Sequence, residues 1–200
     1  MTPPGTFERV YAAIKQRLLE GVYRPGDRLE PAVLSDELNA SVTPVRDALH
    51  RLVGERLVEA PRHEGFRVPM LSEPLLRQLY GWHFDLLLLA LMKHRSGSLP
   101  DHLAGDPGES LQTRQNHLFA LLARSSGNPE HVAALETVTQ RLEPVQRLEA
   151  MFLDALDAET SEILEALRAN DRKALRSSLA RYHRRREKIA PELLAALLHG

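Results

Sequence analysis

The pattern of hydrophobic and polar positions changes near residue 70 and divides the chain into two parts. Before this point, short apolar stretches with helical spacing alternate with glycine and proline, which interrupt regular structure. After it, leucine and alanine recur with helical spacing over much longer stretches. The change predicts two domains, residues 1–70 and residues 71–200, joined at about residues 69–73.

Three helices are predicted in the first part. The first ends at Gly21, where the apolar spacing stops, and the second spans residues 31–39 after a turn at Pro25-Gly26. Thr43 is the predicted N-cap of the third helix, which ends at about Glu55. Of the three, this last helix has the clearest division between an apolar and a polar face.

One face of the third helix is an apolar stripe, formed by Val45, Ala48, Leu49, Leu52 and Val53. The opposite face carries polar side chains, those of Thr43, Arg46, Asp47 and His50. We expect the apolar face to pack against its own domain. The polar face is then free to contact a partner.

A β-hairpin is predicted after the third helix. Residues 57–60 and residues 65–68 have the short apolar runs of strands, and Gly65 lies at the turn between them. Three helices followed by a hairpin are the arrangement of a winged helix-turn-helix.

Beyond residue 70 the pattern predicts only helices, at about residues 73–95, 108–125, 129–155, 158–169 and 171–198. Pro144 and Pro191 are expected to bend or restart theirs, and Ser96–Gly108 is a predicted loop. The predicted fold class is therefore mainly α: an N-terminal winged helix-turn-helix followed by an all-α helical bundle.

Composition narrows the classes of function. The 200 residues are 43% apolar and 26% charged, with no cysteine and a net charge of −1. Without cysteine the chain has no disulfide framework, zinc finger or thiol nucleophile, and a reducing cytoplasm suits it. The longest apolar run, Leu86–Met92, is too short to span a membrane, and the first nine residues lack the features of a signal peptide. We expect a cytoplasmic protein without a membrane segment.

The polar face of the third helix carries groups that can read DNA. A helix of about ten residues fits the major groove. The guanidinium of Arg46 can address guanine O6 and N7, or a phosphate, with two hydrogen bonds. Thr43 can bond a phosphate, and His50 extends the same face by one turn. A solvated helix face is the alternative, and it stays open for His50 and Arg51 in particular.

Three motifs of the first part follow in order: the turn Pro25–Leu29 (PGDRL), the helix start Thr43–Leu49 (TPVRDAL) and Gly65 in the hairpin. Their order and separation resemble the GntR family of bacterial transcriptional regulators. The resemblance implies that the wing, through Arg62, His63 and Gly65, lies near the minor groove of bound DNA. A plain hairpin turn is the alternative explanation for Gly65.

Two positions depart from that family. Many members carry an arginine where this chain has Val42, and some carry one where it has Ala32. The resemblance therefore implies weaker DNA binding or a different operator, rather than loss of DNA binding.

The helical part resembles the C-terminal domain of the FadR-like (FCD) subgroup of the same family, over about residues 72–190. The resemblance rests on Asn116–Phe119 with Ser125–Asn128, and on Ile163–Leu167 with Asn170-Asp171. Many members bind a divalent metal through one aspartate and three histidines on these helices.

This chain keeps few of those ligands. His117 matches the first histidine, but Thr113 stands at the aspartate position and Thr160 at the second histidine position. The third position is Tyr182, unless a shift of one residue brings in His183. We expect no metal and no cofactor, because threonine hydroxyls are poor ligands for zinc or nickel. The five residues are instead candidates for a polar cavity that contacts an effector, or for groups that bond only to one another.

A basic run near the C-terminus comprises Arg181 and Arg184–Arg186. It is either a solvated face or a patch that attracts a carboxylate effector or the acidic groups of a partner.

Taken together, these features predict a homodimeric transcriptional regulator. One winged helix offers little reading surface, so we expect two copies on a palindromic operator in double-stranded DNA. The helical part is expected to sense a small-molecule effector, with an organic acid as the candidate class; the alternative is that it serves only dimerisation. An enzyme is not expected, since nine histidines and many acids occur without a recognisable nucleophile, phosphate loop or metal spacing.

Overall fold

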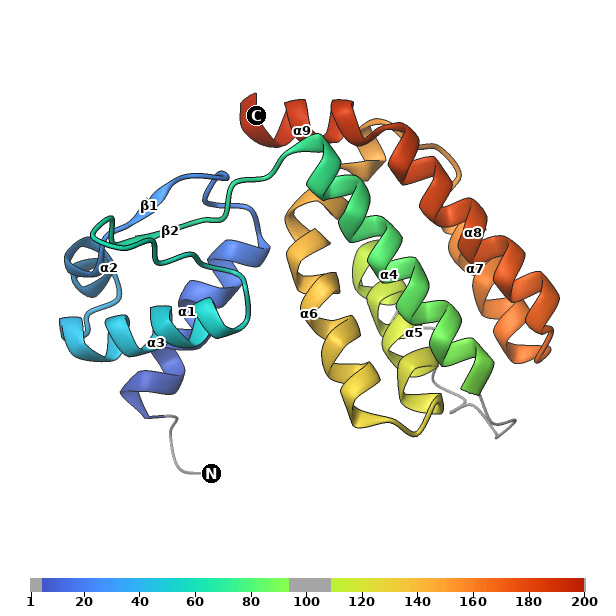
Figure 1. Cartoon of the computed structure of the whole chain (residues 1–200), viewed down its shortest axis with the longest axis horizontal. Helices are drawn as coiled ribbons and strands as arrows, with labels where there is room; N and C mark the ends of the chain where they lie inside the picture. Colours follow the sequence, from blue (N-terminus) through green and yellow to red (C-terminus); the bar gives the residue numbers. More distant parts are fainter. Residues whose placement is uncertain (1–4, 94–108, 200) are drawn as a thin grey trace.

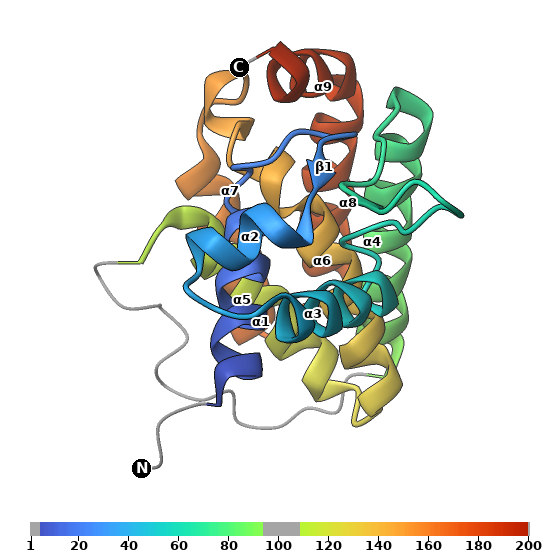
Figure 2. The ribbon, with the colours of Figure 1, turned by 90° about the vertical axis from the view of Figure 1, so that its left-hand side faces the viewer.

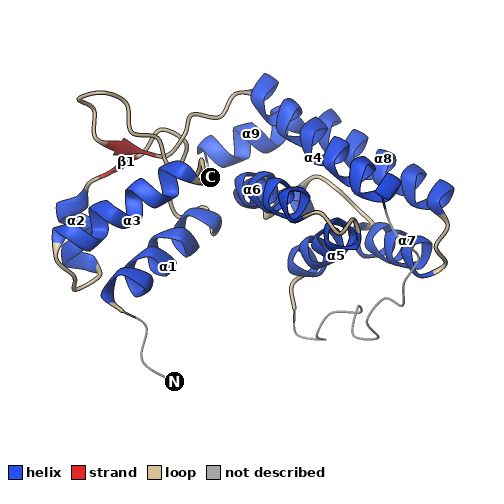
Figure 3. Ribbon diagram, turned by 60° about the horizontal axis from the view of Figure 1, so that its bottom comes forward, coloured by secondary structure: helices blue, strands red, loops and turns tan. Residues whose placement is uncertain are grey.

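The computed structural model describes residues 5–93 and 109–199, which form two lobes (Figure 1). The first lobe contains α1 (Thr6–Leu19), β1 (Arg28–Leu29), α2 (Pro31–Glu37), α3 (Val42–Gly54) and β2 (Phe66–Arg67). The second contains α4 (Glu73–Lys93), α5 (Leu111–Ser125), α6 (Pro129–Gln146), the short 3₁₀ turn η1 (Glu149–Met151), α7 (Leu156–Arg168), α8 (Arg172–Lys188) and α9 (Ala190–His199). Helices dominate both lobes (Figure 3), which confirms the predicted fold class. The predicted loop Ser96–Gly108 lies outside the described residues.

The first lobe is organised around α1 and α3, which pack against each other. The stripe predicted on α3 is buried, and Val45, Ala48, Leu49 and Leu52 have no exposed surface. From α1, Val10 and Ile14 fill the same core. Burial of this stripe fixes which face of α3 points outward.

The start of α3 differs from the prediction. The helix begins at Val42, so Ser41 is the N-cap and Thr43 lies inside the first turn. Pro44 is tolerated there because the first backbone N–H groups of a helix have no partner within it. The prediction that Thr43 caps the helix is therefore wrong, and its side chain is exposed on the first turn.

The predicted hairpin is only partly formed. Its second strand, β2, pairs antiparallel with β1, in a segment that the sequence indicated as part of a turn. The first predicted strand contributes a single bridge, between Glu59 and Arg67. Leu57 and Val58 donate their backbone N–H groups to the Leu52 carbonyl at 3.0 and 3.3 Å, at the end of α3, and so are not available to extend a sheet.

The second lobe is a bundle in which α4 packs against α5, α6 and α8. Its core is separate from that of the first lobe and consists largely of leucine. The helix predicted at residues 129–155 ends at Gln146, two residues after Pro144, and a turn of 3₁₀ helix follows. The helix predicted at residues 171–198 is divided at Ile189, because Pro191 has no N–H to continue the hydrogen-bond ladder.

The two lobes meet between α1 and α6. Arg147, which follows α6, donates from Nε to the Leu19 carbonyl at the end of α1, at 3.0 Å. Figure 2 looks from the side of the first lobe and shows α2 and α3 in front of the bundle. The exposed face of α3 is thus held away from the bundle, at the free side of the first lobe.

Candidate functional site

The exposed face of α3 carries three of the residues predicted to contact DNA. Thr43, Arg46 and His50 are exposed, whereas the opposite face is buried. Within the part of the chain that the structure describes, Arg46 makes no hydrogen bond or ion pair with another side chain. Its five N–H donors are therefore free to bind a partner molecule.

The start of α3 adds to the positive character of this face. Ser41 makes no side-chain capping bond to the described backbone, so the N–H groups of the first turn have no protein acceptor there. Free N–H groups and the positive end of the helix dipole both favour a phosphate. Arg46 and the helix start therefore favour the same kind of ligand.

His50 connects α3 to the wing. Its ring packs edge-on against Phe66 of β2, with centroids 4.9 Å apart. Arg51, by contrast, lies over the Tyr11 ring at 4.1 Å and reaches Glu55 at 3.4 Å. Arg51 thus contacts residues of its own lobe, while His50 links the polar face of α3 to the wing. Sequence reasoning missed Phe66, which no helical or strand pattern marks as a partner of α3.

The wing tip is exposed from Arg62 to Gly65. His63 and Gly65 both have positive φ, 64° and 76°. A Cβ at position 65 would meet no atom within 4 Å, so the requirement for glycine comes from the backbone conformation. Arg62 has no described partner, whereas Glu64 pairs with Arg67 at 3.1 Å.

The structure does not gather the five candidate effector residues around one cavity. Thr113 lies exposed on the first turn of α5, beside its N-cap Ser110. His117 is 61% exposed and faces Glu109 at 3.4 Å. These two residues lie one turn apart on the same face of α5, and that face points outward.

The other three candidate residues lie inside the bundle. Thr160 accepts a hydrogen bond from Gln115 at 2.7 Å and donates to the Leu156 carbonyl at 2.8 Å. Tyr182 and His183 on α8 are fully buried. His117 on the surface cannot join them as a ligand, so the positions that hold a metal in the FCD subgroup do not fit one here. Among the described residues, no three histidine or acidic side chains form a group that could hold a metal ion.

A buried ionic cluster, formed by Arg186, Glu149, Glu159 and Tyr80, lies inside the bundle. Arg186 has no exposed surface and donates from Nε to Glu149 at 2.9 Å and from Nη1 to Glu159 at 2.8 Å. The Tyr80 hydroxyl donates to Glu149 at 3.0 Å. Burial raises the pKa of Glu149, although Arg186 and Tyr80 oppose the shift. One guanidinium thus pairs with two carboxylates in the interior, and Arg185 reaches the second of them, Glu159, at 3.3 Å.

Arg186 corrects the interpretation of the basic run as one solvated or effector-binding face. Arg181 and Arg184 are exposed, but Arg186 is buried and Arg185 pairs with Asp154 at 2.8 Å. The sequence does hold a signal for this difference. Arg186 falls one turn after Tyr182 in the same stripe as the buried leucines of α8.

His183 forms a pair with a residue that sequence reasoning missed, His83 of α4. His83 Nδ1 lies 2.8 Å from His183 Nε2, and His183 Nδ1 lies 2.7 Å from the Leu179 carbonyl. Because a carbonyl only accepts, His183 Nδ1 carries a proton, its neutral Nε2 accepts, and His83 Nδ1 donates. His83 Nε2 is then a buried acceptor, and neither it nor the Tyr182 hydroxyl has a hydrogen-bond partner among the described residues.

The comparison with protein families matches residues 6–68 to the model described as "Bacterial regulatory proteins, gntR family". The HTH-type transcriptional regulator McbR of Escherichia coli (strain K12) is 29% identical over 188 residues, which are 84% of each chain. The HTH-type transcriptional repressor GlaR of the same strain is 30% identical over 89 residues, 44% of this chain and 40% of GlaR.

Solved structures extend the likeness to the helical lobe. The structure of E. coli McbR/YncC has a TM-score of 0.69 and 25% identity, and the match covers 94% of this chain and 98% of that one. A GntR-type transcriptional regulator from Rhodococcus sp. RHA1 has the same fold, with a TM-score of 0.75, 21% identity and 95% and 98% of the two chains covered. No helix in the described parts of the chain is long and apolar enough to cross a membrane. Residues 6–68 therefore belong to the GntR family of bacterial transcriptional regulators and form a DNA-binding winged helix-turn-helix, and the helical lobe has the fold of E. coli McbR/YncC.

Proposed function

We propose that this regulator binds a palindromic operator as a homodimer and that a small-molecule effector controls its affinity for that operator. The observation that carries the DNA-reading part is the unpartnered guanidinium of Arg46 on the exposed first half of α3. An arginine in this position has no structural role to explain it. Two hydrogen bonds to guanine O6 and N7, or to a phosphate, would use its planar fork.

The neighbouring residues take roles that follow from their places. Thr43, beside the uncapped helix start, bonds a phosphate. His50 extends the reading face by one turn while its ring stays packed on the wing. The wing tip, with Arg62, His63 and Gly65, lies beside the minor groove.

Arg46→Ala tests this assignment. The operator fragment is first selected from genomic DNA, and its affinity is then measured by fluorescence anisotropy at fixed salt. Loss of the bidentate donor is expected to weaken specific binding by about 1–3 kcal/mol. Arg176→Ala, an exposed arginine on α8, is the matched control and should leave affinity unchanged. Equal operator affinity of the Arg46→Ala protein and the wild type would refute the proposed role.

Dimerisation is proposed to use the outer face of α4. Trp82, Leu89 and Met92 lie at helical spacing on this face and are 48%, 40% and 75% exposed. Large apolar side chains in one stripe favour burial against a second copy, and a two-fold pair of heads matches a palindromic site.

The effector response is proposed to involve buried polar groups beside the ionic cluster, namely the Tyr182 hydroxyl and the His83–His183 pair. Its support is that the Tyr182 hydroxyl and His83 Nε2 are buried without described partners, which costs free energy unless another molecule satisfies them. Thr160 and His183 adjoin this cluster, whereas Thr113 and His117 are proposed to contact an effector only at the surface of α5. An effector that binds one arrangement of the two heads better than another would shift DNA affinity by that difference.

Tyr182→Phe separates this proposal from a helical domain that only dimerises. The change removes the unpartnered hydroxyl and keeps the ring, so it should not lower stability. A panel of small carboxylic acids is screened for a change in operator affinity, and any response should weaken in the Tyr182→Phe protein. A response of equal size in both proteins would contradict a role for the hydroxyl.

A further inference from the structure

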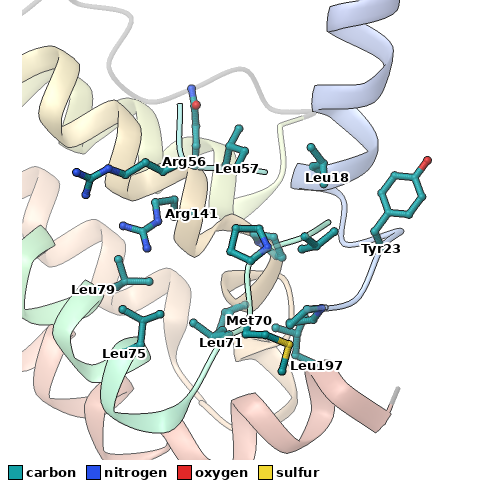
Figure 4. Close-up of a pocket in the computed structure, with 16 residues that line it drawn as sticks. Leu18, Tyr23, Arg56, Leu57, Met70, Leu71, Leu75, Leu79, Arg141 and Leu197 are labelled. Carbon is teal, nitrogen blue, oxygen red and sulfur yellow. The ribbon is translucent and has the colours of Figure 1, made fainter. Parts of the chain in front are cut away.

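A cavity of about 70 Å³ lies between the two lobes, and side chains of both lobes line it (Figure 4). Leu18 and Leu57 come from the first lobe, and Leu75, Leu79 and Val145 come from the bundle. Apolar side chains therefore make up most of its wall. The cavity is distinct from the buried ionic cluster, which lies deeper in the bundle and shares none of these residues.

Two arginines, one from each lobe, lie on the same side of this cavity (Figure 4). Arg56 follows the C-terminal end of α3, and Arg141 belongs to α6. They also line an adjoining, more open hollow of about 460 Å³. Burial and the charge of Arg56 both lower the pKa of Arg141. Two cations thus approach each other at the border of an apolar space.

Among the described residues that line the two spaces, no carboxylate is free to compensate this pair. Among the described residues, the guanidinium groups of Arg56 and Arg141 have no hydrogen-bond or ion-pair partner. Glu59 lines the adjoining hollow, but its carboxylate pairs with Arg67 at 3.2 Å. The geometry therefore leaves two convergent guanidinium groups without an anion.

Arg56 also has an uncommon backbone conformation, with φ of 60°. It is the residue after the C-cap of α3, and the N–H groups of Arg56 and Leu57 bond back to Val53 and Leu52 at 3.0 Å each. Glycine is the residue that fits such a helix end best. An arginine at this position has a strained backbone, and within the described structure its side chain makes no hydrogen bond or ion pair that would offset the strain.

From these observations we propose that the cavity binds a small organic anion, whose carboxylate lies between Arg56 and Arg141 and whose apolar body contacts the leucines. A carboxylate can accept charge-assisted hydrogen bonds from both guanidinium groups, and it would cancel their repulsion. Apolar cavities with a few convergent polar groups are the usual form of a small-molecule site. Because each lobe supplies one arginine, such an anion would hold the DNA-reading lobe against the bundle. This site goes beyond the effector response proposed for the buried cluster.

The test uses the full-length protein without DNA, so its outcome is independent of operator recognition. Hexanoate is the probe, titrated by isothermal calorimetry up to about 10 mM. We expect saturable binding, and binding at least about tenfold weaker for hexan-1-ol, which has the same chain without the charge. Sulfate, which has the charge without the chain, should also bind at least about tenfold more weakly.

Two variants remove one guanidinium each with little risk to the fold. Arg56→Gly suits the positive φ, and Arg141→Gln keeps a side chain compatible with a helix. Each should weaken hexanoate binding at least about tenfold, whereas Arg176→Gln on the exposed face of α8 should change it less than about twofold. Absence of saturable binding, wild-type affinity for hexanoate in both variants, or equal binding of hexanoate and hexan-1-ol would each overturn the proposal.

Discussion

Acidification from about pH 7 to about pH 5 should destabilise the helical lobe, because His83 and His183 must stay neutral in the folded chain. Burial lowers the pKa of His183 to about 3, and the charge of Arg186 acts in the same direction. Burial, His183 and Arg186 together lower the pKa of His83 well below its usual value. The hydrogen bond between the two rings needs a neutral acceptor at His183 Nε2, at 2.8 Å from His83.

The sign follows from comparing the folded and unfolded chains. An unfolded histidine titrates near pH 6.5, so below that value the unfolded chain binds protons that the folded chain excludes. The free energy of unfolding therefore falls as the pH falls from 6.5 towards 3, the pKa of folded His183. At about pH 5 the loss from His183 is RT ln(1 + 10^1.5), or about 2 kcal/mol, and His83 adds a loss of the same sign. The raised pKa of Glu149 acts in the opposite direction, because that group takes up its proton more readily in the folded state.

Urea denaturation at several pH values measures this effect, with the fluorescence of Trp82, the chain's single tryptophan, as the signal from the helical lobe. His83→Asn keeps a donor in the place of Nδ1 and removes one titrating group. Glu149 titrates in both proteins, so the difference between them isolates the histidine. The variant should lose less stability than the wild type on acidification, whereas His117→Asn at the exposed position should lose as much as the wild type. An equal loss in the wild type and the His83→Asn protein would refute the reasoning.

Three further predictions concern the ionic cluster, the assembly and the metal. Arg186→Met should destabilise the chain by about 3–5 kcal/mol, because it leaves the buried Glu149 without a cation and Glu159 with only Arg185 at 3.3 Å, and Arg184→Met, on the exposed face, should have little effect in the same urea titration. Light scattering should give about twice the chain mass of 22.5 kDa for the wild type and a mass near 22.5 kDa for Trp82→Glu; a monomeric wild type would contradict the dimer. Elemental analysis should find no stoichiometric transition metal in the purified protein, and one tightly held metal per chain that is lost in His117→Ala would contradict this expectation.

The exposed face of α3 could be predicted from the sequence, because the apolar stripe that determines it lies within the helix itself. Val45, Leu49 and Leu52 repeat with the period of a helix, and burial of that stripe determines that Arg46 and His50 point outward. The sheet could not be predicted in the same way. β1 is two residues long and lies far from β2 in the chain, so neither a period nor a turn marks their pairing.

The interior of the bundle shows a second limit of sequence reasoning. Thr113 and His117 share a helix face, as their spacing requires, yet spacing does not say which face of α5 the other helices cover. Tyr182 and His183 are adjacent in the chain and both buried, because several helices surround α8 at this level. The polar partners of α8, Glu149 and Glu159, come from segments that only tertiary packing brings together.

The arginines of this chain have different roles because they differ in burial and in their partners. Arg186 is buried and pairs with two carboxylates, so its charge is already compensated and removal of a partner would cost stability. Arg46 is exposed and unpartnered, and water solvates it until a phosphate or a base replaces that water. Arg56 and Arg141 stand between these cases, because they are unpartnered yet border an apolar cavity. An anion gains most at such a position, since the surrounding low dielectric strengthens the attraction and the repulsion of the two cations is relieved at the same time.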